Sequence, residues 1–128
     1  MHTKHNPPTV AAPASTYSHG VEVKPNARWL YISGQVGVLP DGRTAADFTA
    51  QAETCWKNIS NVLKAAGMGI DDLVKITTFV CNPADVVTLR AVRDRFIGTA
   101  RPASTLVVVA ALASPDWLVE IEAVAAKA

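Results

Sequence analysis

The sequence predicts an α+β domain built on a mixed sheet, and three features of the chain support this fold class. Residues 44–66 and 83–97 carry apolar side chains at the three- and four-residue spacing of amphipathic helices. Segments rich in β-branched and aromatic residues lie before, between and after them. A helix that connects two strands favours a parallel pair, whereas short turns near the chain ends favour antiparallel pairs.

The start of the chain combines a segment without predicted structure and three predicted strands. Residues 1–13 contain three prolines and are predicted to be flexible, while residues 14–128 have the length of a single domain. Residues 17–23 and 28–33 are predicted to pair as a hairpin around the turn-forming residues between them. Residues 35–39 continue as a short strand until a Pro-Asp-Gly turn.

The first helix is predicted to begin at Thr44. Thr44 and Asp47 have the three-residue spacing at which a hydroxyl and a carboxylate satisfy the free amides of a first helical turn. One apolar stripe follows, formed by Phe48, Ala52, Cys55, Ile59, Val62, Leu63 and Ala66. Gly67 is placed to end the helix in a left-handed conformation.

The second half of the chain alternates a strand, a helix and two strands. Residues 73–81 are predicted as a strand, and the Asn-Pro pair at 82–83 is typical of a helix start. Gly98 is placed to close this second helix. Residues 106–112 and 117–125 complete a predicted sheet of six strands.

One predicted strand also indicates how the chain assembles. Residues 106–112 are apolar on both faces, yet two helices can cover only one side of such a sheet. At about 25 cal/mol per Å² of apolar surface, leaving this strand exposed is costly, and a partner subunit is the simplest cover. The sequence therefore predicts an obligate homo-oligomer.

Charge and cysteine usage restrict the partners and the compartment. A formal net charge of +1 does not favour nucleic acid or an acidic membrane as a partner. The N-terminus has no apolar run of the length a signal peptide needs, and no stretch of eighteen apolar residues occurs. Cys55 and Cys81 lack metal or redox spacing and are predicted to be reduced core thiols. A cytoplasmic location follows as the expectation.

The common motifs of metal, cofactor and nucleophile chemistry are absent, so no metal ion and no cofactor is expected. His2 and His5 are expected to be solvated in the N-terminal segment. Strand alternation places Glu120 and Glu122 on the same face of the last strand. They form either a solvated edge or, beside a cleft, a carboxylate that orients a water molecule as general base.

Arginines form the only dense positive cluster, at positions 90, 93, 95 and 101. The simplest interpretation is a solvated helix face that Asp94 partly neutralises. A guanidinium fork also suits a carboxylate or a phosphate, so one of them is a candidate anion-binding residue. An RNA surface is the third alternative, although no aromatic side chains alternate with the arginines to stack bases.

Six short motifs, taken in order and spacing, resemble the RidA/YjgF/L-PSP family from about Pro13 to the end of the chain. They are Tyr17-Ser18, Ile32-Ser33-Gly34-Gln35, Asn58-Ile59 with Val62-Leu63 and Ala65-Ala66-Gly67, Asp72-Leu73-Val74-Lys75, Pro102-Ala103, and Val119-Glu120-Ile121-Glu122-Ala123. The resemblance implies a chorismate-mutase-like (YjgF-like) fold with two helices packed on one face of the sheet. It also implies a homotrimer, whose central barrel takes the other face of each sheet and whose three clefts lie between subunits.

The resemblance also implies a set of cleft residues. In members that act as imine deaminases, an arginine directly after Pro-Ala grips the substrate carboxylate. A tyrosine, a Ser-Gly pair and the first glutamate of the last strand complete the pocket. The matching positions here are Tyr17, Ser33, Gly34 and Glu120, with Glu120 orienting water. The arginine position is Ser104, which cannot supply the charge of a bidentate guanidinium.

Two other arginines are candidates to replace the missing one. Arg101 precedes Ser104 by three residues, and Arg90 stands where the deaminases tend to carry asparagine. Because neither occupies the matching position, the expected function is a trimer that binds a small metabolite without ordinary imine deaminase activity. The alternative is a hydrolase of C=N bonds acting on enamines or imines such as 2-aminoacrylate. Endoribonuclease or translation-inhibitor activity is the third hypothesis, which the charge distribution does not favour.

Overall fold

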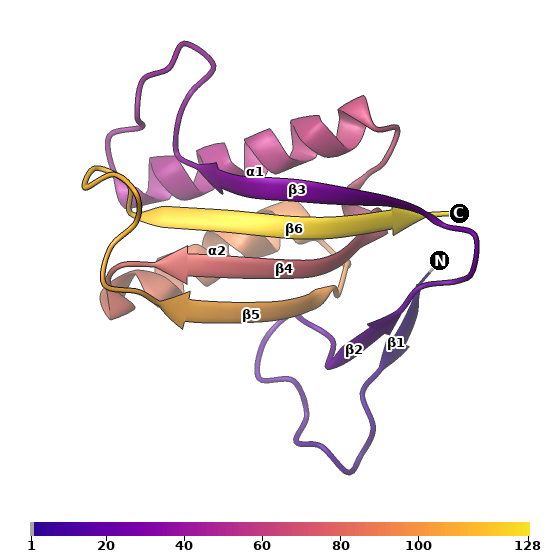
Figure 1. The fold of residues 1–128 in the computed structure, drawn as a ribbon. Helices are drawn as coiled ribbons and strands as arrows, with labels where there is room; N and C mark the ends of the chain where they lie inside the picture. The colour runs from indigo at the N-terminus through magenta and orange to yellow at the C-terminus, as the bar shows by residue number, and fades with distance from the viewer. Residues whose placement is uncertain (1) are drawn as a thin grey trace.

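The computed structural model describes residues 2–128, and its centre is a mixed four-stranded sheet (Figure 1). Along the sheet the strands are β3 (Arg28–Val36), β6 (Val119–Lys127), β4 (Leu73–Val80) and β5 (Ala103–Val108). β4 and β5 are parallel, whereas β6 is antiparallel to both of its neighbours, β3 and β4. The predicted mixed character of the sheet is confirmed, but the sheet has four strands rather than six, because β1 and β2 form a separate sheet. The second helix connects the parallel strands β4 and β5, as expected.

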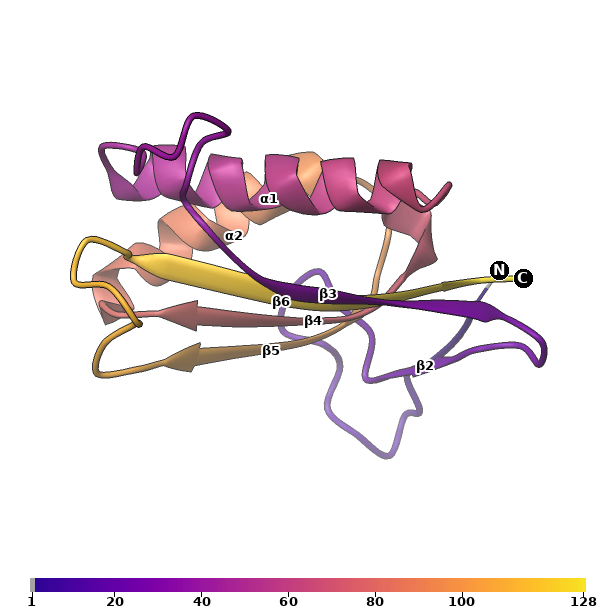
Figure 2. The same ribbon diagram turned by 45° about the horizontal axis from the view of Figure 1, so that its top comes forward.

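Both long helices pack on the same face of this sheet (Figure 2). α1 (Phe48–Ala65) contacts β3 and β6, and α2 (Val86–Ile97) lies beside α1. Trp56 of α1 is fully buried and stacks on Phe96 of α2 at a centroid distance of 6.2 Å. The opposite face of the sheet has no helix and exposes apolar side chains, among them Tyr31 and Val107. This uncovered face is the one that the sequence analysis assigns to a subunit interface.

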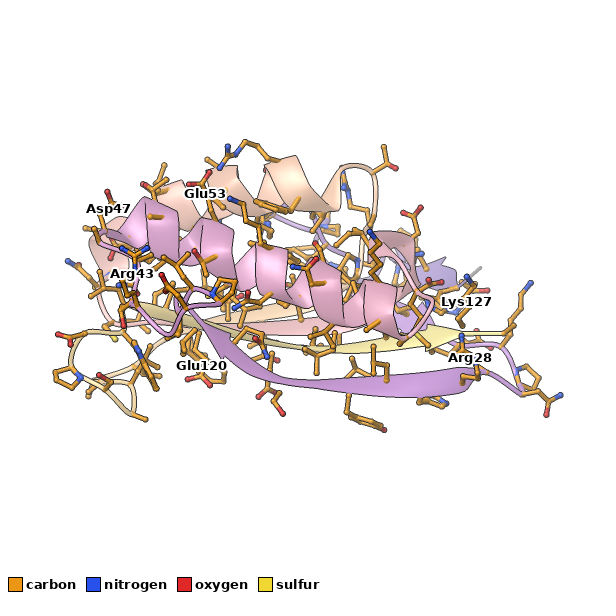
Figure 3. The ribbon with its side chains drawn as sticks, turned by 90° about the horizontal axis from the view of Figure 1, so that it is seen from above. Arg28, Arg43, Asp47, Glu53, Glu120 and Lys127 are labelled. Atoms are coloured by element: carbon orange, nitrogen blue, oxygen red, sulfur yellow. The ribbon has the colours of Figure 1, made fainter. Side chains whose placement is uncertain are left out.

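The first helix begins three residues later than predicted. Asp47, not Thr44, is the N-cap, and its carboxylate accepts a hydrogen bond of 2.8 Å from the amide of Ala50 (Figure 3). An aspartate accepts strongly at this position because its charge also complements the helix dipole. Gly67 follows the helix with φ +71°, the left-handed conformation predicted for it.

The second helix ends where its flanking residues predict but begins three residues later than predicted. The side chain of Asn82 accepts from the amide of Ala84 at 3.0 Å and caps a short 3₁₀ turn, η2 (Pro83–Asp85), that leads into α2. Gly98 closes α2 with φ +55°. A second 3₁₀ turn, η1 (Ile70–Asp72), joins α1 to β4.

The predicted hairpin of residues 17–23 and 28–33 is wrong. β2 (Gly20–Glu22) instead pairs with β1 (Thr3–His5), a strand within the segment predicted as flexible, and forms a separate two-stranded sheet near β5. β3 pairs with the long strand β6 instead. α1 packs against both of these strands. The turn between β2 and β3 includes Asn26 at φ 65° and redirects the chain rather than closing a hairpin.

Two further strand predictions differ from the structure. The predicted strands 28–33 and 35–39 are not separate: β3 runs from Arg28 to Val36 with a register shift between Ile32 and Gln35, and residues 37–39 lie beyond its end. β5 ends at Val108 rather than at residue 112. Its parallel partner β4 ends at Val80, whose carbonyl accepts a hydrogen bond from the amide of Val109. Residues beyond Val109 therefore have no neighbouring strand.

The two cysteines are free thiols in the structure. Burial, with a smaller contribution from the charge of Glu120, raises the pKa of Cys55 to about 12, so this thiol is protonated and unreactive at neutral pH. Cys81 is half-buried and directly follows β4. Within residues 2–128, neither helix combines the length and the apolar composition that a membrane crossing needs.

Candidate functional site

The segment that carries Tyr17 is fixed to α2 by two short side-chain hydrogen bonds. Nη2 of Arg93 donates to Oγ of Ser15 at 2.6 Å, and Oγ1 of Thr16 donates to Oδ1 of Asp94 at 2.6 Å. Arg93 also lines a pocket together with Ser104 and Leu106 of β5. The segment therefore runs alongside the helix and presents its side chains at the edge of the sheet.

Two further hydrogen bonds attach the same segment to the start of β5. The amide of Ser18 donates to the Pro102 carbonyl at 3.1 Å, and its hydroxyl donates to the Arg101 carbonyl at 2.6 Å. Ser18 is buried and forms an isolated parallel bridge with Ala103. Tyr17 is thereby held between the second helix and the first residues of β5.

A small pocket of about 210 Å³ lies at this junction. Tyr17 and Ser104, which the family resemblance predicts to share a cleft, both line it. Arg90 of α2 lines it as well. The complete lining is Ser15, Tyr17, Arg90, Arg93, Ser104 and Leu106. Three hydroxyls, two guanidinium groups and one apolar wall therefore surround a space of metabolite size.

The two pocket arginines differ in their surroundings. The Arg93 side chain is only 8% exposed, and its Nε forms an ion pair of 3.0 Å with Asp94. Partial desolvation raises the pKa of Asp94, but hydrogen bonds from Thr16 and Arg93 outweigh this and hold the pKa below its usual value. Asp94 is therefore charged at neutral pH and balances Arg93.

Arg90 is exposed, and its side chain forms no ion pair or hydrogen bond with residues 2–128. The simple picture of a solvated arginine face is thus wrong for Arg93, which is buried, and correct for Arg95, which pairs on the surface with Glu53 at 2.7 Å. Figure 3 shows Glu53 on α1, in the helix layer.

Arg101 does not line the pocket of Tyr17 and Ser104. Its Nη1 donates to the carbonyls of Gly98 at 2.9 Å and Ala100 at 2.7 Å, folding the side chain back on its own loop. The side chain instead lines another hollow, together with Lys4, Asp71, Leu73, Thr99 and Ala100. Of the two arginines predicted as replacements for the missing guanidinium, the structure brings only Arg90 to the pocket.

Glu120 and Gly34 form a second local arrangement. Val36 pairs with Glu120 across β3 and β6, and the register shift in β3 includes Ser33 and Gly34. The Glu120 carboxylate lies directly over the backbone of Gly34, because a Cβ built there would be 1.9 Å from Oε2. Ser33 is exposed next to them. A glycine at 34 is thus required for close approach of the carboxylate.

The two sets of predicted residues lie on opposite faces of the sheet. Glu120 pairs with Phe79 of β4, while Ser104 pairs with Ile76 of the same strand. Directly paired residues share a face, and residues three apart along a strand point to opposite faces. Ile76 is buried beneath the helices, so Ser104 lies on the helix side and Glu120 on the uncovered side. One chain therefore cannot line a single cleft with both sets.

Replacing Gly34 with alanine is expected to displace the Glu120 carboxylate without unfolding the protein. The clashing atoms belong to the end of a flexible side chain, which can rotate away at little cost. A crystal structure of Gly34→Ala should show Glu120 in another rotamer, with a melting temperature close to that of the wild type. Gly69→Ala is the matched control, because a Cβ there meets nothing within 4 Å. An unmoved carboxylate in Gly34→Ala would show that the close approach is not what positions Glu120.

Sequence reasoning missed two parts of this site. It did not single out Ser15, and it treated Arg93 as one of several equivalent surface arginines. The three-residue spacing of Arg90 and Arg93 was the available signal, since it places both on one side of a helix. Within residues 2–128 there is no group of three or more histidine, cysteine, aspartate or glutamate side chains able to hold a metal ion.

The chain resembles known proteins over nearly its whole length. The family model described as Endoribonuclease L-PSP matches residues 8–127. The chain is 35% identical over 125 residues to 2-iminobutanoate/2-iminopropanoate deaminase of Escherichia coli (strain K12), covering 93% of this chain and 94% of the relative. It is 34% identical over 117 residues to Protein HMF1 of Saccharomyces cerevisiae, covering 91% and 88%.

Solved structures agree with this result. YyfB from Yersinia pestis, a Rid family protein of unknown function, matches with a TM-score of 0.86 and 34% identity over 97% of both chains. TdcF of Escherichia coli with bound serine matches with a TM-score of 0.75 and 30% identity over 91% of both chains. With a family model spanning residues 8–127, relatives above 30% identity and the same small α+β fold, this chain belongs to the RidA/YjgF/L-PSP family.

Proposed function

We propose that this protein is a cytoplasmic homotrimer that binds a small metabolite in clefts between its subunits, with little ordinary imine deaminase activity. The observation that carries the proposal is the separation of the predicted cleft residues on two faces of one sheet. Tyr17 and Ser104 line one half-site, while Ser33, Gly34 and Glu120 form the other. The edge of one chain and the uncovered face of the next would complete each cleft.

Two further observations support this function. The relative TdcF holds serine, a small amino acid, in its solved structure. The pocket at Tyr17 is small, about 210 Å³, which suits a ligand of a few heavy atoms. Ser104 carries no charge where the family resemblance implies a carboxylate-gripping arginine. The usual orientation of an imine substrate therefore lacks its main anchor.

Subunit complementation tests whether each cleft combines residues from two chains. Tyr17→Phe and Glu120→Gln should each weaken binding of serine or 2-oxobutyrate, measured by calorimetry on the separate variants. Trimers that are unfolded and refolded as an equal mixture should recover about a quarter of the wild-type sites, because random assembly pairs an intact Tyr17 with a neighbour's intact Glu120 at that frequency. A cleft built within one chain would recover no sites in the mixture.

Hydrolysis of a C=N bond is the second candidate function, and the similarity to the E. coli deaminase favours it. In such a reaction, water oriented by Glu120 would add to the imine carbon and ammonia would leave, giving a 2-oxo acid. This function requires a cation elsewhere in the cleft to orient the substrate.

A further inference from the structure

The pocket at Tyr17 carries one positive charge that no ion pair within the described residues balances. Its lining includes two guanidinium groups and no carboxylate. Asp94 neutralises Arg93 through a direct ion pair, whereas Arg90 forms no ion pair within residues 2–128. A pocket with an unbalanced cation and several hydroxyl groups favours an anionic ligand.

The remaining arginines near the site are already used. Arg95 pairs with Glu53, and Arg101 donates to two carbonyls of its own loop. Neither lines the pocket that contains Tyr17 and Ser104. Arg90 is therefore the one exposed guanidinium that this pocket holds among the described residues.

Arg90 lies on the part of α2 whose next turn holds the Tyr17 segment in place. It lies one helical turn before Arg93 and Asp94, which bind the Ser15–Thr16 segment and so hold Tyr17 against the same helix. Nε and Nη2 of Arg93 are occupied by Asp94 and Ser15, so this buried guanidinium serves mainly to build the pocket wall. Ligand binding then depends on Arg90, and Tyr17 and Ser104 line the same pocket.

We infer that Arg90 is the anion-binding residue of the cleft and takes a small carboxylate from the α2 side, in place of an arginine at position 104. The inference rests on the proposed function. Because the carboxylate is then held by the helix rather than by β5, the rest of the ligand enters the cleft in a different orientation. The same ligand would consequently present a different atom to Glu120 of the neighbouring chain.

Calorimetry on the full-length protein tests this assignment with 2-oxobutyrate and its neutral amide as probes. Wild type should bind the carboxylate in preference to the amide. Arg90→Ala should weaken carboxylate binding about tenfold or more, as expected for the loss of two charge-assisted hydrogen bonds, and Arg90→Lys should fall between the two. Arg95→Ala is the matched control, because it removes the same charge from the same helix outside the pocket.

The outcomes separate the inference from the proposed function. Equal affinity of wild type and Arg90→Ala for 2-oxobutyrate, or loss of binding in Arg95→Ala to the same degree, overturns the role of Arg90 while the cleft remains. Preference for the neutral amide overturns it as well. A folded wild-type protein that binds neither probe overturns the proposed function, and the role of Arg90 with it.

Discussion

Val107→Asp should reduce the mass of the protein in solution from about 41 kDa, the mass of the proposed trimer, to the 13.6 kDa of one chain. Val107 pairs with Phe79 and lies on the uncovered face of the sheet, where it is 37% exposed. If that face is a subunit interface, each trimer would bury uncompensated carboxylates, at roughly 3 to 5 kcal/mol for each unpaired charge. Light scattering at micromolar concentration measures the result.

The matched control for this substitution is Val87→Asp. Val87 is 78% exposed on α2, away from the uncovered face, so its carboxylate should stay in water and the mass should remain that of a trimer. A wild-type protein with the mass of one chain would contradict the trimer itself. A Val107→Asp variant that stays trimeric and folded would place the interface elsewhere on the surface.

Moving the cation from the helix to the strand should create imine deaminase activity. In the double variant Arg90→Asn with Ser104→Arg, the guanidinium occupies the position that the family resemblance implies, and no second unpaired arginine repels it. Hydrolysis of 2-imino acids, generated in situ by an amino acid oxidase, should then exceed the wild-type rate about tenfold or more, since a fixed bidentate anchor aligns the imine carbon. The release of 2-oxo acid gives the rate.

Two companion variants show whether the new activity arises in the cleft. Adding Glu120→Gln to the double variant should abolish the gain, because the amide cannot accept a proton from water. Replacing Ser104 with lysine instead of arginine should give a smaller gain, since an ammonium lacks the planar fork. If the arginine double variant is a folded trimer that hydrolyses imines no faster than the wild type, Ser104 does not occupy the anchoring position.

The elements that the sequence predicts well are those whose signals are local. Most of the predicted apolar stripe of α1 is buried, with Val62 and Ala66 partly buried, and Gly67 and Gly98 adopt positive φ where the helices end. The failed hairpin shows the limit of local signals. The turn sequence around Asn26 indicates only that the chain changes direction. Whether β3 pairs with β2 or β6 depends on which strand α1 can also pack against, and that strand is β6.

The candidate site follows the same division. Residues matched by short motifs, Tyr17 and Ser104, meet in one pocket, and Gly34 lies beneath Glu120. The burial of Arg93 could not be predicted, because it depends on Ser15, which is 78 residues away in the chain. Arg90 and Arg101 were both candidates by sequence. Only the direction of the Arg101 side chain toward its own loop separates them.

The attachment of the Ser15–Ser18 segment has a consequence for how the chain folds. Its hydrogen bonds join residues separated by 78 positions at α2 and by 83 positions at the start of β5. The closure of a large loop must precede contacts of such long range, as it must for the pairing of β3 with β6. During synthesis, Tyr17 cannot reach its final place until α2 and residues beyond Pro102 have emerged. A chain that stops before Pro102 therefore has no anion-binding half-site to occupy.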